Sequence, residues 1–196
     1  MTGRLIVIAG HSGVGKSTIA QAVCKKNSWV LLDKDTLAGP LVDMWMRHHT
    51  EDPQNRSHPR YQEIRNAEYL ALTGTSIEIL ANGVGTVCVV APFVQPADLS
   101  ELEFLVDLNR LDVSGLWVTC TAQEHRSRLV ARGSARDRTK IARLHDWVSG
   151  NHDAPALPTW MSPFNNGTTK SLSGLAESVV RALEVGAVKP IGEKAE

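Results

Sequence analysis

Short apolar runs alternate along the chain with stretches of helical periodicity, and this alternation predicts an α/β fold. Runs rich in β-branched residues are typical of buried strands, and they lie at residues 4–9, 29–32, 86–90 and 116–120. Apolar spacings of three and four predict helices at residues 16–26, 36–47, 61–82, 101–109, 122–132, 141–148 and 172–185. Strands that alternate with helices imply right-handed crossovers, so we expect one parallel sheet covered on both faces.

Turn and capping residues predict where several of these elements begin and end. Ser100 and Glu103 have the spacing of a capping box, which predicts that a helix begins at residue 101. The sequence Thr73-Gly74-Thr75 predicts a kink or break within residues 61–82. Residues 48–59 and 151–168 contain prolines and lack periodicity, so we expect a loop and an irregular segment there.

Composition narrows the class of protein. The 196 residues suit a single domain, which we expect to span residues 1–190. With 42% hydrophobic and 21% charged residues, and no apolar run of about 20 residues, neither a disordered chain nor a membrane protein is expected. The apolar run near the amino end is too short for a signal peptide. Three widely spaced cysteines fit neither a disulfide framework nor a zinc site, so we expect a cytoplasmic protein.

Charge weighs against nucleic acid as a partner. Lys and Arg together number 21, and so do Asp and Glu, so the formal net charge is zero. A general affinity for polyanions is therefore not expected, although a local basic patch can still bind phosphate.

The loop after the first predicted strand matches the pattern G-x-x-x-x-G-K-[ST] at every fixed position. It reads Gly10-His11-Ser12-Gly13-Val14-Gly15-Lys16-Ser17, and Thr18 follows. Glycines let successive backbone N–H groups point at one anion, and the amino end of the next helix adds its positive dipole. We predict that this loop cradles a nucleoside triphosphate, that Lys16 reaches the β- and γ-phosphates, and that Thr18 contacts the α-phosphate. The Ser17 hydroxyl is predicted to coordinate Mg²⁺.

Two carboxylates follow the second predicted strand. Alternation along an extended segment would place Asp33 and Asp35 on the same side, facing the phosphate loop if the second strand neighbours the first. We predict that Asp35 accepts the proton of an acceptor hydroxyl. Asp33 would then contact Mg²⁺ through water or anchor a second hydroxyl, and the two roles could be exchanged. The alternative is a solvated turn in which Asp35 caps the next helix.

Residues 121–150 carry seven basic side chains against three acidic ones. Guanidinium groups neutralise the charge that develops in phosphoryl transfer, so we predict a lid that closes over the nucleotide. Arg132 and Arg136 are the first candidates, followed by Arg138 and Arg128. The alternative is an ordinary solvated helical face.

Polar and aromatic side chains gather on one face of the helix predicted over residues 61–82. Tyr61, Arg65, Glu68 and Tyr69 are three or four residues apart. They would line a pocket for the acceptor, with Arg65 and Tyr69 as its contacts, or form surface ion pairs above packed tyrosines. The pattern favours neither alternative.

Taken together, the phosphate loop and three further segments resemble the small P-loop kinases. These segments are Asp33-Lys-Asp-Thr-Leu37, Val89-Val-Ala-Pro-Phe93 and Arg128-Leu-Val-Ala-Arg-Gly-Ser-Ala-Arg136-Asp137. Over residues 4–185 the chain is similar to the group that includes polynucleotide kinase domains, zeta toxins, chloramphenicol phosphotransferase and gluconate kinase. The resemblance implies a P-loop NTPase three-layer sandwich with about five parallel strands, an acceptor-binding region near 37–75 and an arginine-rich lid near 121–150. It also implies that Asp35 is the general base, and that the loop at Asn165-Asn166 lies near the adenine, with Asn165 in contact with the nucleotide.

One departure from other P-loop proteins refines the prediction. The third predicted strand ends in Val90-Ala91-Pro92 and lacks the acid typical of motor ATPases and GTPases, and no Asn-Lys-x-Asp guanine motif is present. We therefore predict a kinase that uses Mg·ATP to phosphorylate a hydroxyl of a small molecule, either a metabolite or an antibiotic. The alternatives are a polynucleotide 5′-hydroxyl kinase, which neutral charge and 5% aromatic residues disfavour, and a regulatory nucleotide-binding protein without transfer activity.

Overall fold

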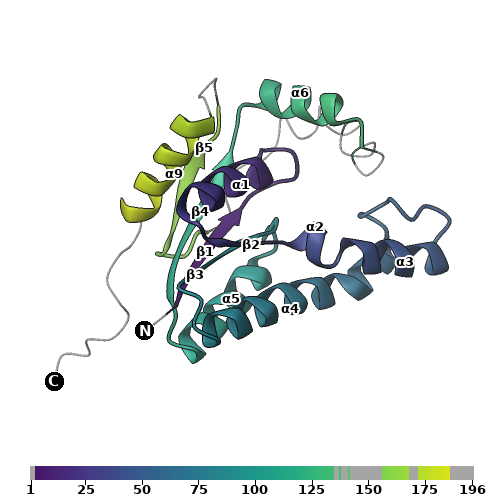
Figure 1. Cartoon of the computed structure of the whole chain (residues 1–196). Helices are drawn as coiled ribbons and strands as arrows, with labels where there is room; N and C mark the ends of the chain where they lie inside the picture. Colours follow the sequence, from purple (N-terminus) through teal and green to yellow (C-terminus); the bar gives the residue numbers. More distant parts are fainter. Residues whose placement is uncertain (1–2, 135–136, 138–140, 142–155, 168–171, 186–196) are drawn as a thin grey trace.

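Five parallel strands form the centre of the molecule (Figure 1). The computed structural model describes residues 3–134, 137, 141, 156–167 and 172–185. The strands are β1 (Arg4–Ala9), β2 (Val30–Asp33), β3 (Thr86–Val90), β4 (Asp112–Thr119) and β5 (Met161–Asn165). Their order across the sheet is β2-β3-β1-β4-β5.

Helices cover both faces of this sheet. They are α1 (Lys16–Asn27), α2 (Lys34–Leu37), α3 (Gly39–His49), α4 (Pro59–Ala81), α5 (Pro96–Leu108), α6 (Ala122–Arg132) and α9 (Leu172–Val185). Successive β1 side chains point to opposite faces, so Ile6 and Ile8 pack with α1 and α9, whereas Leu5 and Val7 pack with α4 and α5. The predicted three-layer α/β sandwich of the P-loop type is confirmed.

A smaller apolar cluster lies away from the sheet. Val42 and Met46 of α3 pack with Tyr61 at the start of α4, and Trp45 and Ile64 lie against them. This cluster joins α3 to α4 on the side where α2 and α3 extend from the sheet in Figure 1.

The strand order corrects one expectation. β2 does not neighbour β1, because β3 lies between them and pairs with both: Cys88 is opposite Ile6 on one side and Leu31 on the other. β1 and β2 are therefore separated by the width of one strand, and were expected to be direct neighbours.

Other differences concern element boundaries. The segment expected to be irregular contains β5, whose Pro163 is tolerated because β5 is an edge strand. The capping box of α5 is formed by Gln95 and Asp98, five residues before the predicted one, so the helix begins at Pro96. Helix α4 continues through Gly74 without a break, and the Thr73 hydroxyl bonds back to the Tyr69 carbonyl. The helix expected at 141–148 lies outside the described residues apart from Ile141.

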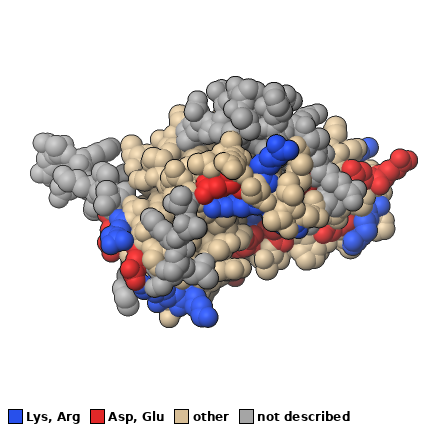
Figure 2. All heavy atoms as spheres, turned by 90° about the horizontal axis from the view of Figure 1, so that it is seen from above, with Lys and Arg blue, Asp and Glu red and all other residues tan. Residues whose placement is uncertain are grey.

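Charge is mixed rather than segregated on the surface that Figure 2 shows. Basic and acidic side chains of the described residues lie beside one another on this face, in keeping with the equal totals in the sequence. Within the part of the chain that the structure describes, no helix is both long enough and apolar enough to cross a membrane.

Candidate active site

The phosphate loop, residues 10–17, connects β1 to α1 at the carboxyl edge of the sheet. Gly10, Gly13 and Gly15 have φ angles of 131°, 92° and 98°, which side chains rarely allow. A Cβ on Gly10 would lie 2.3 Å from the carbonyl oxygen of Val118 on β4. The glycines therefore satisfy both the backbone conformation and the close packing of the loop.

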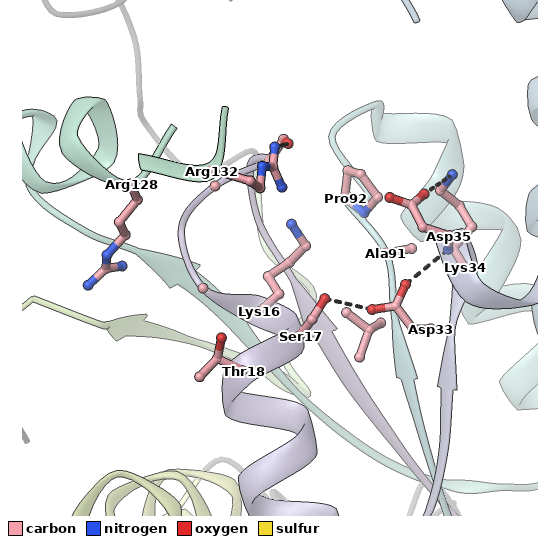
Figure 3. Close-up of a pocket in the computed structure, with 14 residues that line it drawn as sticks. Lys16, Ser17, Thr18, Asp33, Lys34, Asp35, Ala91, Pro92, Arg128 and Arg132 are labelled. Carbon is pink, nitrogen blue, oxygen red and sulfur yellow. Dashed lines mark hydrogen bonds and ion pairs between the residues drawn. The ribbon is translucent and has the colours of Figure 1, made fainter. Parts of the chain in front are cut away.

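A cavity of about 350 Å³ opens beside this loop (Figure 3). Its walls come from the loop, the first turn of α1, the end of β2, the end of β3 and α6; they comprise Ser12, Gly13, Gly15, Lys16, Ser17, Thr18, Asp33, Lys34, Asp35, Val90, Ala91, Pro92, Arg128 and Arg132. The Lys16 ammonium donates a hydrogen bond to the His11 carbonyl at 2.8 Å. A cavity edged by backbone amides, a lysine and a helix amino end is suited to an anion.

Arg128 and Asn166 hold the phosphate loop from outside. Arg128 donates one hydrogen bond to the carbonyl of Val14 and one to that of Asn166, both at 2.8 Å. The Asn166 side-chain amide donates to the same Val14 carbonyl at 2.8 Å. Helix α6 and the residue after β5 thus fix one side of the loop.

Two further α6 side chains contact the loop at Ser12. The His125 Nε2 lies 2.6 Å from the Ser12 carbonyl, which can only accept, so this nitrogen carries the proton. Arg132 donates to the Ser12 hydroxyl at 3.1 Å and also pairs with Asp137. The Arg132 guanidinium therefore stands at the rim of the cavity with its direction set by two partners.

Asp33 connects the end of β2 to the start of α1. One of its carboxylate oxygens accepts the Ser17 hydroxyl at 2.6 Å, and the other accepts the Asp35 amide at 2.9 Å as the cap of α2. The cap is therefore Asp33, and not Asp35 as the alternative interpretation required. Because α2 begins at Lys34, the extended alternation that we expected for the two carboxylates is also wrong; a helical turn places them.

A second cavity of about 470 Å³ adjoins the first. Five residues line both: Ser12, Lys34, Asp35, Pro92 and Arg132. The other walls of the second cavity are His11, Arg56, Tyr61, Gln62, Arg65, Tyr69, Val94, Gln95, Ser134 and Asp137. The Asp35 side chain therefore stands where the two cavities meet.

Arg65 is buried at the back of the second cavity. Its guanidinium donates to both carboxylate oxygens of Asp98 on α5, at 2.8 and 2.5 Å, and lies 4.4 Å from the ring centre of Tyr69. Burial alone lowers the pKa of Arg65, but the hydrogen bonds to Asp98 outweigh it and the pKa lies above its ordinary value. Burial also raises the pKa of Tyr69. Of the two alternatives for this helix face, the structure shows a buried polar wall rather than surface ion pairs.

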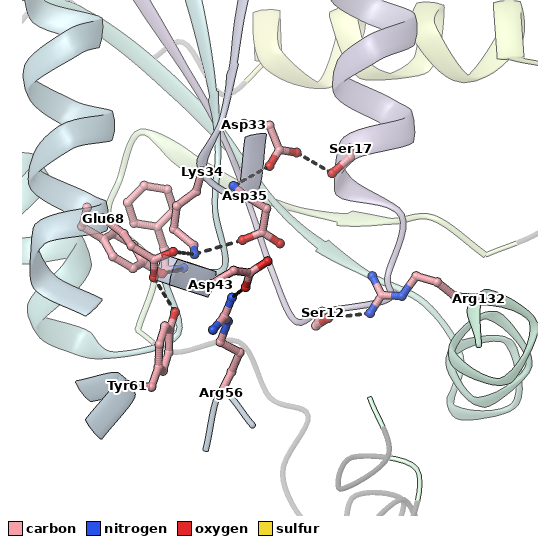
Figure 4. A network of polar contacts seen from close by, with 12 residues as sticks. Ser12, Ser17, Asp33, Lys34, Asp35, Asp43, Arg56, Tyr61, Glu68 and Arg132 are labelled. Atoms are coloured by element: carbon pink, nitrogen blue, oxygen red, sulfur yellow. Dashed lines mark hydrogen bonds and ion pairs between the residues drawn. The ribbon is translucent and has the colours of Figure 1, made fainter. Parts of the chain in front are cut away.

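Lys34, Glu68 and Tyr61 form a buried polar group behind Asp35 (Figure 4). The Lys34 ammonium lies 2.9 Å from Glu68 and 3.0 Å from Asp35, and the Tyr61 hydroxyl donates to Glu68 at 2.6 Å. Burial lowers the pKa of Lys34, yet the charges of Asp35 and Glu68 prevail and the pKa is raised. Burial, aided by Glu68, raises the pKa of Tyr61. These shifts keep Lys34 charged and Tyr61 neutral near pH 7.

The structure brings most of the predicted site residues to these cavities. Gly10 and Val14 line neither: Gly10 packs against β4, and Val14 offers its carbonyl to Arg128. Asn165 also lies outside both linings and accepts a hydrogen bond from the Gly167 amide at 2.8 Å. Arg136 and Arg138 lie outside the described residues.

Lys34 and Asp98 had no role in the sequence prediction. Lys34 lines both cavities, and Asp98 binds Arg65. A lysine between two aspartates was a usable signal for Lys34, because a charge so close to two carboxylates rarely stays unpaired. Nothing local in the sequence pointed to Asp98, which is distant in the chain.

Ser17 and Asp33 are the groups that could hold a metal ion. Their oxygens are 2.6 Å apart and line the first cavity. No group of three or more His, Cys, Asp or Glu side chains able to hold a metal is found among the described residues. Such a sparse set of oxygen ligands fits Mg²⁺, which usually binds one or two protein groups and takes its other ligands from phosphates and water.

Comparison with known proteins agrees with this architecture. A family model described as an AAA domain matches residues 5–150. No curated protein matches the sequence.

Solved structures share the fold at low sequence identity. A candidate kinase from Chloroflexus aurantiacus is 20% identical, with a TM-score of 0.69 over 94% of this chain and 98% of its own. A gluconokinase from Sinorhizobium meliloti is 16% identical, with a TM-score of 0.61 over 95% and 94% of the two chains. The APS kinase of Mycobacterium tuberculosis, solved in complex with AMPPNP and APS, is 16% identical, with a TM-score of 0.55 over 93% and 98%. The fold is therefore that of P-loop kinases.

Proposed function

The chain belongs to the AAA domain family, and on that premise we propose that it is a kinase that transfers the γ-phosphate of Mg·ATP to a hydroxyl of a small molecule. One observation carries the proposal: the Asp35 carboxylate belongs to the walls of two adjoining cavities, one built around the phosphate loop and one built around α4. A phosphoryl transferase needs this arrangement, because the donor and the acceptor must meet at one proton-accepting group.

The first cavity would hold the nucleotide. The loop amides and Lys16 would bind the phosphates, with Thr18 beside the α-phosphate. ATP is favoured over GTP because the chain lacks the guanine motif, and because a structural neighbour was solved with the ATP analogue AMPPNP. Arg128 and Asn165 are proposed as further nucleotide contacts.

Ser17 and Asp33 would hold Mg²⁺. When bound there, the ion neutralises charge on the phosphates. The protein groups orient its site: the Asp33 carboxylate is held by the Asp35 amide, and Ser17 lies in the first turn of α1. Asp33 would thereby supply the acid that β3 lacks at Val90-Ala91-Pro92.

The second cavity would hold the acceptor. Arg65 and Tyr69 line it together with the tyrosine and amide side chains of α4 and the loop before α5. The acceptor hydroxyl would attack the γ-phosphorus and pass its proton to Asp35, while the bond from that phosphorus to the β,γ-bridging oxygen breaks and ADP leaves. Arg132, at the rim of both cavities, would neutralise the charge that develops on the transferred phosphoryl group, and Arg136 is proposed for the same task. Residues 37–75 would form the acceptor region and 121–150 the lid of one domain spanning 1–190.

The test is phosphate transfer from radiolabelled ATP to a panel of sugars, amino acids, nucleosides and aminoglycosides, together with ADP release. We expect Lys16→Ala to weaken ATP binding. Asp35→Asn should reduce transfer by about 10²–10⁴-fold, because it removes the general base.

Asp107→Asn is the matched control, because Asp107 lies exposed near the end of α5, and it should leave transfer unchanged. Transfer at the wild-type rate by Asp35→Asn would refute the assignment of the base. Undiminished ATP affinity in Lys16→Ala would refute the nucleotide site.

A further inference from the structure

Lys34 has an unusual position for a lysine between two aspartates. Its side chain is only 5% exposed, although it lies in the walls of both cavities. Its ammonium lies between the carboxylates of Asp35 and Glu68 (Figure 4). Burial of a flexible, strongly hydrated cation is costly unless its partners are fixed.

Glu68 and Tyr61 fix that ammonium. The Glu68 side chain is 2% exposed; one oxygen binds Lys34 at 2.9 Å and the other accepts the Tyr61 hydroxyl at 2.6 Å. Both residues belong to α4, which is anchored in the core by Leu72 and Leu80. The ring of Tyr69 also lies beneath the ammonium, 6.0 Å from its centre. The cation therefore stands at a point determined by a rigid helix.

Asp35, by contrast, is 64% exposed. A reacting group must be held in one orientation before the reaction, and an exposed carboxylate is not held by packing. The contact from Lys34 to the Asp35 Oδ1 at 3.0 Å joins this exposed group to the buried pair.

We propose that Lys34 is a positioning residue: its ammonium, held by Glu68 and Tyr61, sets the orientation in which Asp35 faces the junction of the two cavities. This inference rests on the proposed function, because the residue that Lys34 orients is the proposed general base, Asp35. Tyr61 lines the second cavity and begins the chain of contacts Tyr61–Glu68–Lys34–Asp35. This chain connects the wall of the proposed acceptor cavity to the proposed base.

The experiment compares the kinetics of ADP release from Mg·ATP with water as the acceptor. Lys34→Met alone would leave Glu68 buried without its counterion, so the main variant is the double substitution Lys34→Met/Glu68→Gln, which removes both charges. We expect kcat to fall by about 10- to 100-fold while KM for ATP changes by less than about twofold, because orientation is lost and phosphate binding is not. Lys34→Arg, which keeps the charge, should recover part of kcat.

Lys26→Met is the matched control. Lys26 also pairs with a glutamate, Glu177, at 2.8 Å, but this pair is exposed and joins α1 to α9 away from the cavities. Its kcat should equal that of the wild type. A crystal structure of the double variant should show the Asp35 carboxylate in a new orientation.

The outcomes separate the two proposals. If Asp35→Asn abolishes turnover and the double variant keeps the wild-type kcat, or if Asp35 keeps its orientation in the crystal, the role of Lys34 is refuted and the kinase remains. An equal loss in kcat and in ATP affinity would also refute it, because that pattern indicates general disruption of the site. If Asp35→Asn itself retains turnover, the assignment of the base fails. In that case, and also if the wild type releases no ADP to water, the crystal structure alone decides whether Lys34 orients Asp35.

Discussion

Substitution of Asp98 by Asn tests the buried ion pair that joins α4 to α5 behind the second cavity. The side chains of Arg65 and Asp98 are 7% and 6% exposed, and the guanidinium makes two hydrogen bonds of 2.8 and 2.5 Å to the carboxylate. Asn has the same shape and keeps an oxygen that can accept the Gln95 amide, so the capping bond at 3.1 Å need not be lost. What is removed is the charge, which leaves the Arg65 cation buried without a counterion.

Loss of one partner of a buried pair costs about 3–5 kcal/mol, and we expect Asp98→Asn to lower the free energy of unfolding by this amount. Removal of both charges in Arg65→Met/Asp98→Asn should cost less than the single substitution, because no buried charge is then left alone. The exposed pair Arg60–Glu63 gives the control, and Glu63→Gln should cost at most about 1 kcal/mol. Urea denaturation of the four proteins measures each value. A loss below about 1 kcal/mol for Asp98→Asn, or a double variant less stable than the single one, would show that the pair does not act as reasoned.

Two further predictions concern packing. Gly10→Ala should destabilise the fold by more than about 1–2 kcal/mol, the cost of a positive φ alone, because the added Cβ also meets the Val118 carbonyl oxygen at 2.3 Å. Gly74→Ala, in open space within α4, should instead stabilise the fold by about 1 kcal/mol. Thermal unfolding that ranks the two variants in the opposite order would contradict this reasoning. Cys24 and Cys88 are buried and should react with iodoacetamide only after unfolding. The partly exposed Cys120 should react slowly in the native protein, because burial raises the pKa of its thiol. Mass spectrometry of native and urea-treated protein measures the labelling, and early labelling of Cys88 would argue against the packing of α1 on β3.

Much of the fold follows from periodicity. The four apolar strands and most helices occur where the pattern predicts them, because buried parallel strands and amphipathic helices are local properties of the sequence. Strand β5 was not predicted, because Met161-Ser-Pro-Phe-Asn165 is short and contains a proline. In the described sheet it is an edge strand paired with β4. Strand order was not predicted either, because the local sequence of β2 does not indicate that β3 lies between β2 and β1.

The site likewise has a part that the sequence predicts and a part that it does not. The phosphate loop is predictable from the sequence because its glycines, lysine and serine belong to one short continuous motif. Ser17 and Asp33 were both expected near Mg²⁺ on the assumption that β2 neighbours β1. They lie in direct contact although β3 separates the two strands, because α1 and α2 begin at the same edge of the sheet. Lys34, Asp98 and Asn166 could be assigned only from the structure, because each contacts a residue that is remote in the sequence: Glu68, Arg65 and Val14 respectively.

The position of β2 at the outer margin of the sheet has an evolutionary consequence. Among the described strands, only β3 pairs with β2, and the α3 segment beyond it forms a small apolar cluster of its own with the start of α4. Insertions, deletions or exchanges between residues 38 and 58 would leave the central strands and the loop around Lys16 in place. If the proposed function holds, variation in this segment would change the acceptor while the nucleotide site stays the same.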